Sequence, residues 1–269
     1  MLLLLAGAAA FSLIGLLDDL YDVGALKLGV EAAVVVAIVW LGGVNARLPW
    51  PYAGEILAVL WILGVANAIN CLDCVDGVAA GTVMVGALFV IPLALFWNHI
   101  GVAIAAAALA GSALGFLRYN FSPARIFLGD AGSLAVGFLA AALPAALIPS
   151  RLHHAALVTW IAPVLLMGVP VGDFLLVHIR RYLHGATDLR RLVTSTGRDH
   201  LPHRLLDAGL TTRQVAVRLY AATALMGASA VSLVLIGPVA AAVLLMVPAA
   251  ALLTTGAARW VTWALARSA

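Results

Sequence analysis

The stretch 67–81, NAINCLDCVDGVAAG, places amide and carboxylate side chains at three-residue steps directly after a long apolar run. On an α-helix such steps carry side chains along one slanted ridge, and a tighter turn brings them almost into column. Their oxygens suit Mg²⁺ or Mn²⁺, which keep bound waters and bind together with a substrate phosphate. Turn and capping chemistry is the alternative for Asp76 and Gly77. The four side chains are Asn67, Asn70, Asp73 and Asp76.

Two adjacent carboxylates, Asp18 and Asp19, end the first apolar run. At a helix C-terminus they would meet the negative end of the helix dipole as well as each other. Their charges therefore call for Lys27, for a divalent metal ion, or for a proton on one carboxyl, which would suit a general base. A plain pair of charges where the helix leaves the apolar region is the alternative.

A third acid, Asp130, stands among small residues in the segment 127–137, FLGDAGSLAVG. Glycines let the backbone approach a ligand closely, and a helix N-terminus favours an anionic phosphate. An N-cap is the alternative role of Asp130. Considered together with the other two acidic clusters, a functional role is the better interpretation.

A basic segment near residue 200 is the fourth candidate. His200, His203 and Arg204 share a face if the segment is helical, and Arg198 comes just before. These side chains could donate charge-assisted hydrogen bonds to a diphosphate, whereas a solvated basic loop is the alternative. A short amphipathic helix with Pro202 in its first turn is predicted by four leucines. They are Leu201, Leu205, Leu206 and Leu210.

A set of cysteines and histidines and an acid within an apolar run indicate function less strongly. Cys71 and Cys74, with His200 and His203, have the ligand types of a zinc site, but we interpret the cysteines as small packing residues. Asp173 lies inside an apolar run, where an acid is usually paired or functional, so we expect Arg180 or Arg181 as its partner. A capping box at Thr211 and Gln214 is predicted to open the next helix.

The elements that position these residues must be membrane helices. With 64% hydrophobic and 10% charged residues and a mean hydropathy of +1.10, the chain has too little polar surface for a soluble globule. We predict an all-α, polytopic transmembrane helical bundle in one domain, 1–269, with a cytoplasmic loop at about 183–213. Nine spans are predicted at 1–17, 28–44, 53–69, 78–97, 100–117, 132–149, 155–179, 213–236 and 239–264.

The basic residues predict the orientation of this bundle. If the first span ends in the cytoplasm, 13 of the 15 Lys and Arg residues lie inside, and only Arg47 and Arg151 lie outside. All four motifs then face the cytoplasm.

Four motifs, in this order, resemble the polyprenyl-phosphate N-acetylhexosamine-1-phosphate transferases of bacteria. They are GLLDDLYDVGALK, NAINCLDCVDGVAAG, RIFLGDAGSLAVGF and GRDHLPHRLLDAGLT, and the resemblance covers nearly the whole chain. It implies a Mg²⁺-dependent reaction, with Mn²⁺ as an alternative ion. A polyprenyl (undecaprenyl) phosphate attacks the β-phosphate of a UDP-N-acetylhexosamine, giving a polyprenyl-diphosphate sugar and UMP for cell-wall or surface polysaccharide synthesis.

The resemblance also implies roles for individual residues and partners. Asn70 and Asp130 would hold the metal ion, and Asp18 and Asp19 would lie by the acceptor phosphate, one of them as base. The implied partners are the UDP-sugar, the polyprenyl phosphate and the lipid bilayer of the bacterial inner membrane, without nucleic acid, and a homodimer is left open. The implied substrate-binding set is Lys27, Asn67, Asp73, Asp76, Arg198, His200, His203 and Arg204.

The chain also departs from the family pattern. Pro202 stands at the middle position of an HxHH motif, Cys74 replaces a common glycine and Glu31 a common glutamine. Related enzymes carry further spans and a basic loop before the DD motif, so we expect the N-terminal spans to be missing. A cation-coupled transporter and an inactive truncated paralogue are the alternative functions. Acids at the cytoplasmic ends of spans favour the transferase over the transporter.

Overall fold

The computed structural model describes residues 1–42, 52–147, 156–183, 197–237 and 239. Within these ranges all regular secondary structure is helical, which confirms the all-α prediction. The helices are α1 (Leu2–Tyr21), α2 (Ala25–Gly42), α3 (Ala53–Leu72), α4 (Val78–Phe96), α5 (Ile100–Asn120), α6 (Gly129–Ala145), α7 (Ala156–Leu166), α8 (Gly168–Leu183), α10 (Leu201–Asp207) and α11 (Thr212–Leu235).

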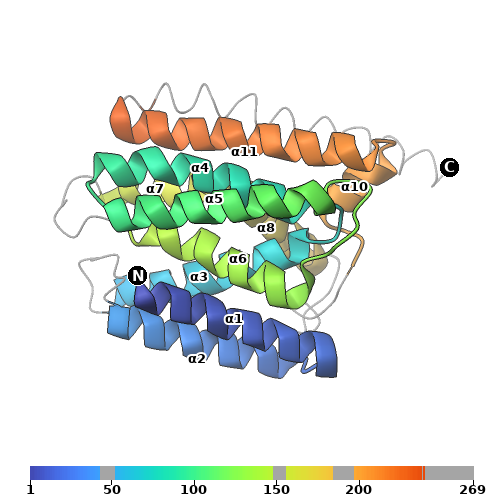
Figure 1. Cartoon of the computed structure of the whole chain (residues 1–269), viewed down its shortest axis with the longest axis horizontal. Helices are drawn as coiled ribbons and strands as arrows, with labels where there is room; N and C mark the ends of the chain where they lie inside the picture. The colour runs from blue at the N-terminus through green and yellow to red at the C-terminus, as the bar shows by residue number, and fades with distance from the viewer. Residues whose placement is uncertain (43–51, 148–155, 184–196, 238, 240–269) are drawn as a thin grey trace.

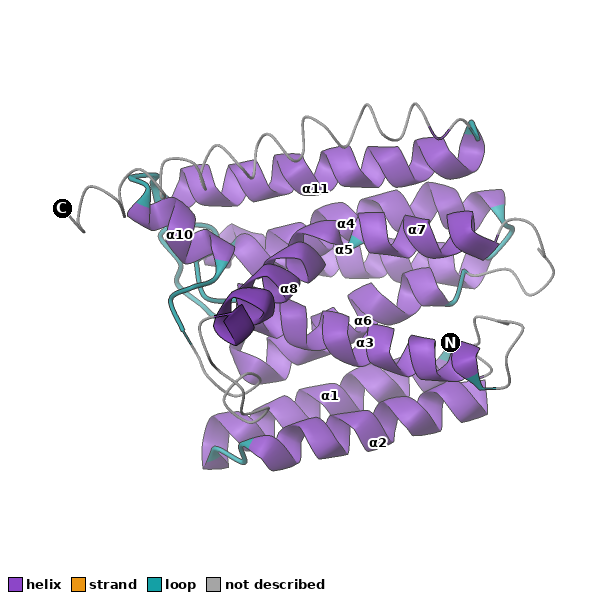
Figure 2. Ribbon diagram, turned by 180° about the vertical axis from the view of Figure 1, so that it is seen from behind, coloured by secondary structure: helices purple, strands orange, loops and turns teal. Residues whose placement is uncertain are grey.

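The long helices lie side by side, with α6 near the middle of the bundle (Figure 1). α6 packs against α1 on one side and α3 on the other, while α4 packs against α5 and α11. The C-terminal ends of α1, α3 and α5 share one end of the bundle with the short helix α10 (Figures 1 and 2). Residues far apart in the sequence therefore meet at this end.

Five described helices are long and apolar enough to cross a membrane, and α6 is apolar but shorter. The chain is accordingly a multi-pass membrane protein, although nine spans are not reached among the described residues. The expected span 239–264 lies outside the described residues, apart from residue 239 itself. The five are α1, α3, α4, α5 and α11.

The segment of the expected span 155–179 is not one continuous helix, because α7 ends at Leu166 and α8 begins at Gly168. Pro170 has no backbone N–H to donate to the preceding turn, so a continuous helix would lose a hydrogen bond there. In the first turn of a new helix that N–H has no intrahelical partner, so proline is tolerated. The break lets α8 leave the direction of α7 (Figure 2).

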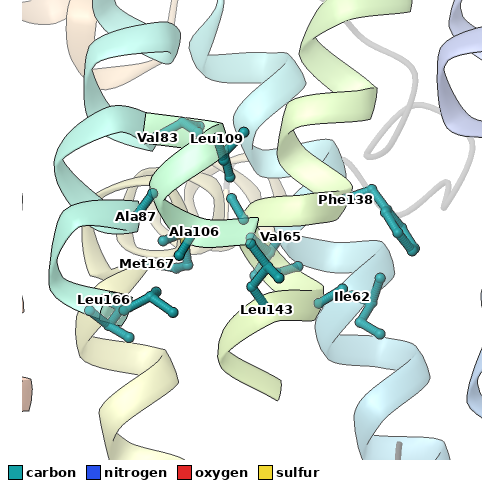
Figure 3. Packing of buried hydrophobic residues seen from close by; sticks show 14 of the residues in the cluster. Ile62, Val65, Val83, Ala87, Ala106, Leu109, Phe138, Leu143, Leu166 and Met167 are labelled. Atoms are coloured by element: carbon teal, nitrogen blue, oxygen red, sulfur yellow. The ribbon is translucent and has the colours of Figure 1, made fainter. Parts of the chain in front are cut away.

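The bundle is held together by a core of small and aliphatic side chains. Figure 3 shows residues of α3, α4, α5, α6 and α7 meeting in it. Phe138 of α6 and Phe11 of α1 are fully buried, with ring centroids 4.9 Å apart. Between membrane helices, close packing and dispersion supply most of the attraction, and small residues allow it. The alanines and glycines of these helices therefore set how closely their backbones approach.

The segment before α11 folds as expected. α10 carries Pro202 in its first turn, and Leu201, Leu205 and Leu210 are buried against α11 and the end of α3. The capping box is present, because Thr211 accepts from the backbone N–H of Gln214 while the Gln214 side chain accepts from that of Thr211. α10 is thereby fixed to the protein near the ends of α3 and α8.

The backbones of α1 and α6 approach each other closely beside Asp130. A Cβ atom at Gly15 would lie 2.2 Å from the carbonyl oxygen of Asp130. We expect Gly15→Ala to destabilise the protein by at least about 1–3 kcal/mol, because overlap with backbone is not relieved by a side-chain rotation. A lower melting temperature in detergent, followed by circular dichroism, measures this. Gly64→Ala on α3 is the matched control, since a Cβ there meets nothing within 4 Å; equal melting temperatures for the two variants would contradict the expectation.

Candidate active site

Lys27, near the start of α2, is the centre of a charged cluster at the end of the bundle. Its ammonium group donates to Asp18 Oδ2 of α1 at 2.9 Å and also to Asp130 Oδ2 of α6. The Lys27 side chain is only 12% exposed, so this charge is largely withdrawn from water. Of the three alternatives for the acidic pair, Lys27 does lie beside Asp18, and its ion pairs join three helices.

Asp19 has a different role from its neighbour. Its carboxylate accepts hydrogen bonds from the backbone N–H groups of Asp130 at 3.1 Å and Ala131 at 3.2 Å. Asp19 thus caps the N-terminus of α6 from α1, where a negative charge also meets the positive end of the helix dipole. The alternative of Asp130 as an N-cap is wrong, because Asp130 lies within the first turn. Gly129, at φ +61°, leaves room for the Asp19 carboxylate.

Asn70 connects the end of α3 to the same cluster. Its Nδ2 donates to Asp130 Oδ1 at 3.0 Å and to Ser133 Oγ at 2.8 Å. Asp73 follows as the C-cap of α3, where burial, together with the negative charge of Asp130, raises the pKa of its carboxyl to about 7. Sequence reasoning missed Ser133, although its spacing of three residues from Asp130 places it on the same face of α6.

The expected common ridge of four polar side chains holds only for its first half, because α3 ends at Leu72. Asn67 donates to Glu31 Oε2 at 2.6 Å, one turn away from the charged cluster. Asp76 accepts from the backbone N–H of Ala124 at 3.0 Å and so fixes the loop before α6. The buried Glu31 was not among the predicted site residues, and an acid in an apolar helix was the signal for it.

Asn120, at the end of α5, was also missed. Its side chain accepts from the N–H of Gly77 at 3.0 Å and donates to the carbonyl of Ile126 at 2.8 Å. The loop that leads to Asp130 is therefore held against the turn between α3 and α4. A polar residue ending a long apolar helix was the available signal.

A second polar cluster surrounds Asp173 of α8. Its carboxylate accepts from His200 Nδ1 at 2.8 Å and from the backbone N–H of Leu201 at 2.5 Å. The expected pairing of Asp173 with Arg180 or Arg181 is wrong, because Arg181 makes two 2.7 Å hydrogen bonds to Asp199 instead. Arg181 lies two helical turns after Asp173, beyond the three- or four-residue spacing at which side chains meet on a helix.

The two histidines of this segment have opposite pKa shifts. Burial by itself would lower the pKa of His200, but the hydrogen bonds to Asp173 and Cys71 raise it to about 10. Burial and the positive charge of Arg198 lower the pKa of His203. At neutral pH the first imidazole is therefore charged and the second neutral. Arg204 is buried in the same turn, whereas Arg198 is exposed.

The described side chains offer few arrangements that could bind a metal ion. Among them, no group of three or more His, Cys, Asp or Glu could hold a metal ion, so the zinc alternative is not supported. Burial raises the pKa of the Cys74 thiol to about 12, which also disfavours the thiolate that zinc needs. The acidic cluster does have a free ligand atom, because Asp18 Oδ1 is buried without a hydrogen-bond partner. One or two carboxylates beside an amide oxygen suit Mg²⁺ when substrate phosphates supply further ligands.

The chain resembles known proteins that are named as transferases. A sequence model of glycosyl transferase family 4 matches residues 1–148. A probable undecaprenyl-phosphate N-acetylglucosaminyl 1-phosphate transferase of Bacillus subtilis is 31% identical over 80% of this chain and 60% of its own length. A decaprenyl-phosphate N-acetylglucosaminephosphotransferase of Mycobacterium leprae is 32% identical over 87% of this chain and 65% of its own. A phospho-N-acetylmuramoyl-pentapeptide-transferase of Moorella thermoacetica is 40% identical over 47% of each. The chain thus spans under two thirds of the length of these relatives.

The charged cluster generates a stability prediction. We expect Lys27→Gln to lower stability by about 3 kcal/mol, because removing one partner leaves buried carboxylates uncompensated. Melting of the purified protein in detergent with a metal chelator measures this. Arg118→Gln, at an exposed position in the last turn of α5, is the matched control and should change stability far less. Equal melting temperatures for wild type and Lys27→Gln would refute the central role of this ammonium group.

Proposed function

The chain belongs to glycosyl transferase family 4, and from this premise we propose that it transfers an N-acetylhexosamine 1-phosphate from a UDP-sugar to a polyprenyl phosphate. An oxygen of the acceptor phosphate would form a bond to the β-phosphorus of the UDP-sugar. The bond from that phosphorus to the bridging oxygen would break, and UMP would leave. The names of the relatives from Bacillus subtilis and Mycobacterium leprae support this reaction class.

One observation carries the proposal, namely the network of Lys27, Asp18, Asp130 and Asn70 at the shared end of four helices. Bringing two polyanions together requires concentrated positive charge and fixed orientation, which are the main sources of catalysis in such reactions. Lys27 provides a cation that could turn from the carboxylates to a phosphate. No observation in the described part of the chain favours a transporter.

We propose that Asn70 and Asp130 would hold Mg²⁺, with Mn²⁺ as the alternative ion. When bound, the ion supplies positive charge to the diphosphate of the UDP-sugar. The fit rests on the oxygen-rich donor set and on the unpartnered Asp18 Oδ1 beside it. Asp73, at the end of α3, is close enough for its carboxyl to respond to the charge of Asp130. His200, His203, Arg198 and Arg204 would bind the sugar diphosphate from the opposite side of α3.

We propose that the two adjacent carboxylates, Asp18 and Asp19, have different roles near the acceptor phosphate. Both oxygens of Asp19 are occupied by backbone N–H groups of α6, whereas Asp18 keeps one free oxygen. Asp18 is therefore the better candidate to take a proton from the acceptor phosphate, and Asp19 holds α6 in place. We further propose that this end of the bundle faces the cytoplasm of a bacterial cell, as the distribution of basic residues predicts.

The reaction is tested with the purified full chain, a polyprenyl phosphate, Mg²⁺ and labelled UDP-N-acetylglucosamine. We expect label in the lipid fraction and release of UMP. Asp130→Asn should reduce turnover at least about a hundredfold, and it should remain folded because Asp18 still pairs with Lys27. Absence of lipid-linked label and of UMP with every UDP-N-acetylhexosamine tried would exclude the transferase function for this chain. Unchanged turnover by Asp130→Asn would exclude only its metal role.

The division between the two carboxylates is tested by a matched pair of variants. Asp18→Asn should lower kcat by about a hundredfold or more, as loss of a proton acceptor does. Because Asp130 still pairs with Lys27, this variant should cost less stability than Lys27→Gln. Asp19→Asn keeps one carbonyl oxygen for the N–H groups of α6, so we expect a lower melting temperature and a smaller loss of kcat. The reverse ranking of the two kcat values would assign the base to Asp19.

A further inference from the structure

Asp173 makes the contacts that join α8 to the histidine segment. Its side chain is buried, and each of its two oxygens serves a different group on the next element. One accepts from His200 Nδ1 at 2.8 Å, and the other from the N–H of Leu201, the first residue of α10, at 2.5 Å. No side-chain cap comes from His200 itself at the start of α10. The carboxylate of α8 therefore takes the place of an N-cap for α10.

We infer that Asp173 is a positioning residue of the proposed transferase site, which holds His200 through Nδ1 so that its Nε2–H donates to the substrate diphosphate. The inference rests on the proposed function. Asp173 itself touches no substrate and acts only through His200 and the start of α10.

The chemistry of the imidazole ring supports this role. The two ring nitrogens are distinct, and a hydrogen bond at one of them fixes the orientation and proton of the other. With Nδ1 held by a carboxylate, Nε2 is the ring nitrogen that remains for Cys71 or for a ligand. A carboxylate that orients a histidine from behind is a recurrent arrangement in enzymes. The pKa of about 10 means that His200 keeps its positive charge over the whole neutral range.

His200 also lies close enough to the acidic cluster for both to serve one site. Cys71 contributes to the raised pKa of His200, and Asn70, its neighbour in α3, donates to Asp130. The last turn of α3 therefore contacts the histidine segment on one side and the acidic cluster on another. Because Pro202 occupies the middle position of the histidine motif, that position has no imidazole to share the work.

Several other charged or titratable groups lie around this pair. Those that act on His200 or Asp173 from α3, α8 and the segment of α10 are Cys71, Cys74, Arg181, Asp199, His203 and Arg204. Asp173 is the group among them that receives a hydrogen bond from His200 Nδ1. Removing its charge should return the pKa of His200 toward the ordinary value of 6.5.

The test measures UDP binding to the full chain by calorimetry at pH 6 and at pH 8.5, in the same Mg²⁺ concentration. Asp173→Asn keeps an acceptor for the N–H of Leu201 but removes the charge. We expect it to bind UDP within about threefold of wild type at pH 6, and at least about tenfold more weakly at pH 8.5, where its His200 is neutral. His200→Asn should already be about tenfold weaker at pH 6, and the double variant no weaker than His200→Asn alone. Asp22→Asn, at the exposed C-cap of α1, is the control, and its UDP affinity relative to wild type should be the same at both pH values.

The outcomes separate the two proposals. Wild-type protein that binds no UDP at either pH would overturn the proposed function and this inference with it. If wild type binds UDP and the affinity of Asp173→Asn relative to wild type is the same at both pH values, the inference alone would be overturned. If Asp173→Asn does not fold, His200→Asn decides, because wild-type affinity in that variant would exclude His200 as a ligand of the diphosphate.

Discussion

Charge compensation in a largely buried cluster is the constraint on which the site end of this protein depends. The ammonium group of Lys27 neutralises carboxylates that come from two other helices. These three side chains can meet only if the end of α1 and the starts of α2 and α6 lie at the same level. In water such pairs would be worth little, but withdrawn from water an uncompensated carboxylate is costly. The helix ends are therefore aligned by electrostatics, whereas the body of the bundle is aligned by packing.

The last turn of α3 connects the acidic cluster to the histidine segment. Consecutive residues on a helix point in different directions, so Asn70 reaches the acidic cluster while Cys71 reaches His200. A single helix end thus separates a negatively charged wall from a positively charged one. In the proposed reaction, a diphosphate would meet the cations of the histidine segment on one side. On the other side it would meet Lys27 or a metal ion held by the acidic cluster.

Some of this could be predicted from sequence and some could not. The ordered motifs predicted the family, and the leucine spacing predicted α10. The adjacent acids Asp18 and Asp19 predicted a need for compensation, with Lys27 as one of three candidates. Local patterns failed where the partner comes from another helix. Asp19 caps α6 across the bundle and Asp173 caps α10, and neither contact follows from periodicity or capping rules within one segment. The break before α8 was missed for another reason, since hydropathy alone does not register the missing N–H of Pro170.

Lys27 is the only lysine in the sequence, and it lies inside the ion-paired cluster. An amine reacts with electrophiles only when it is deprotonated and accessible, and ion pairing with Asp18 and Asp130 suppresses both conditions. Within this sequence, acylation of side-chain amines is therefore confined to one nitrogen atom, whose reactivity reports whether the cluster is intact. The same feature offers a route to a single spectroscopic probe placed where the acceptor phosphate is proposed to bind.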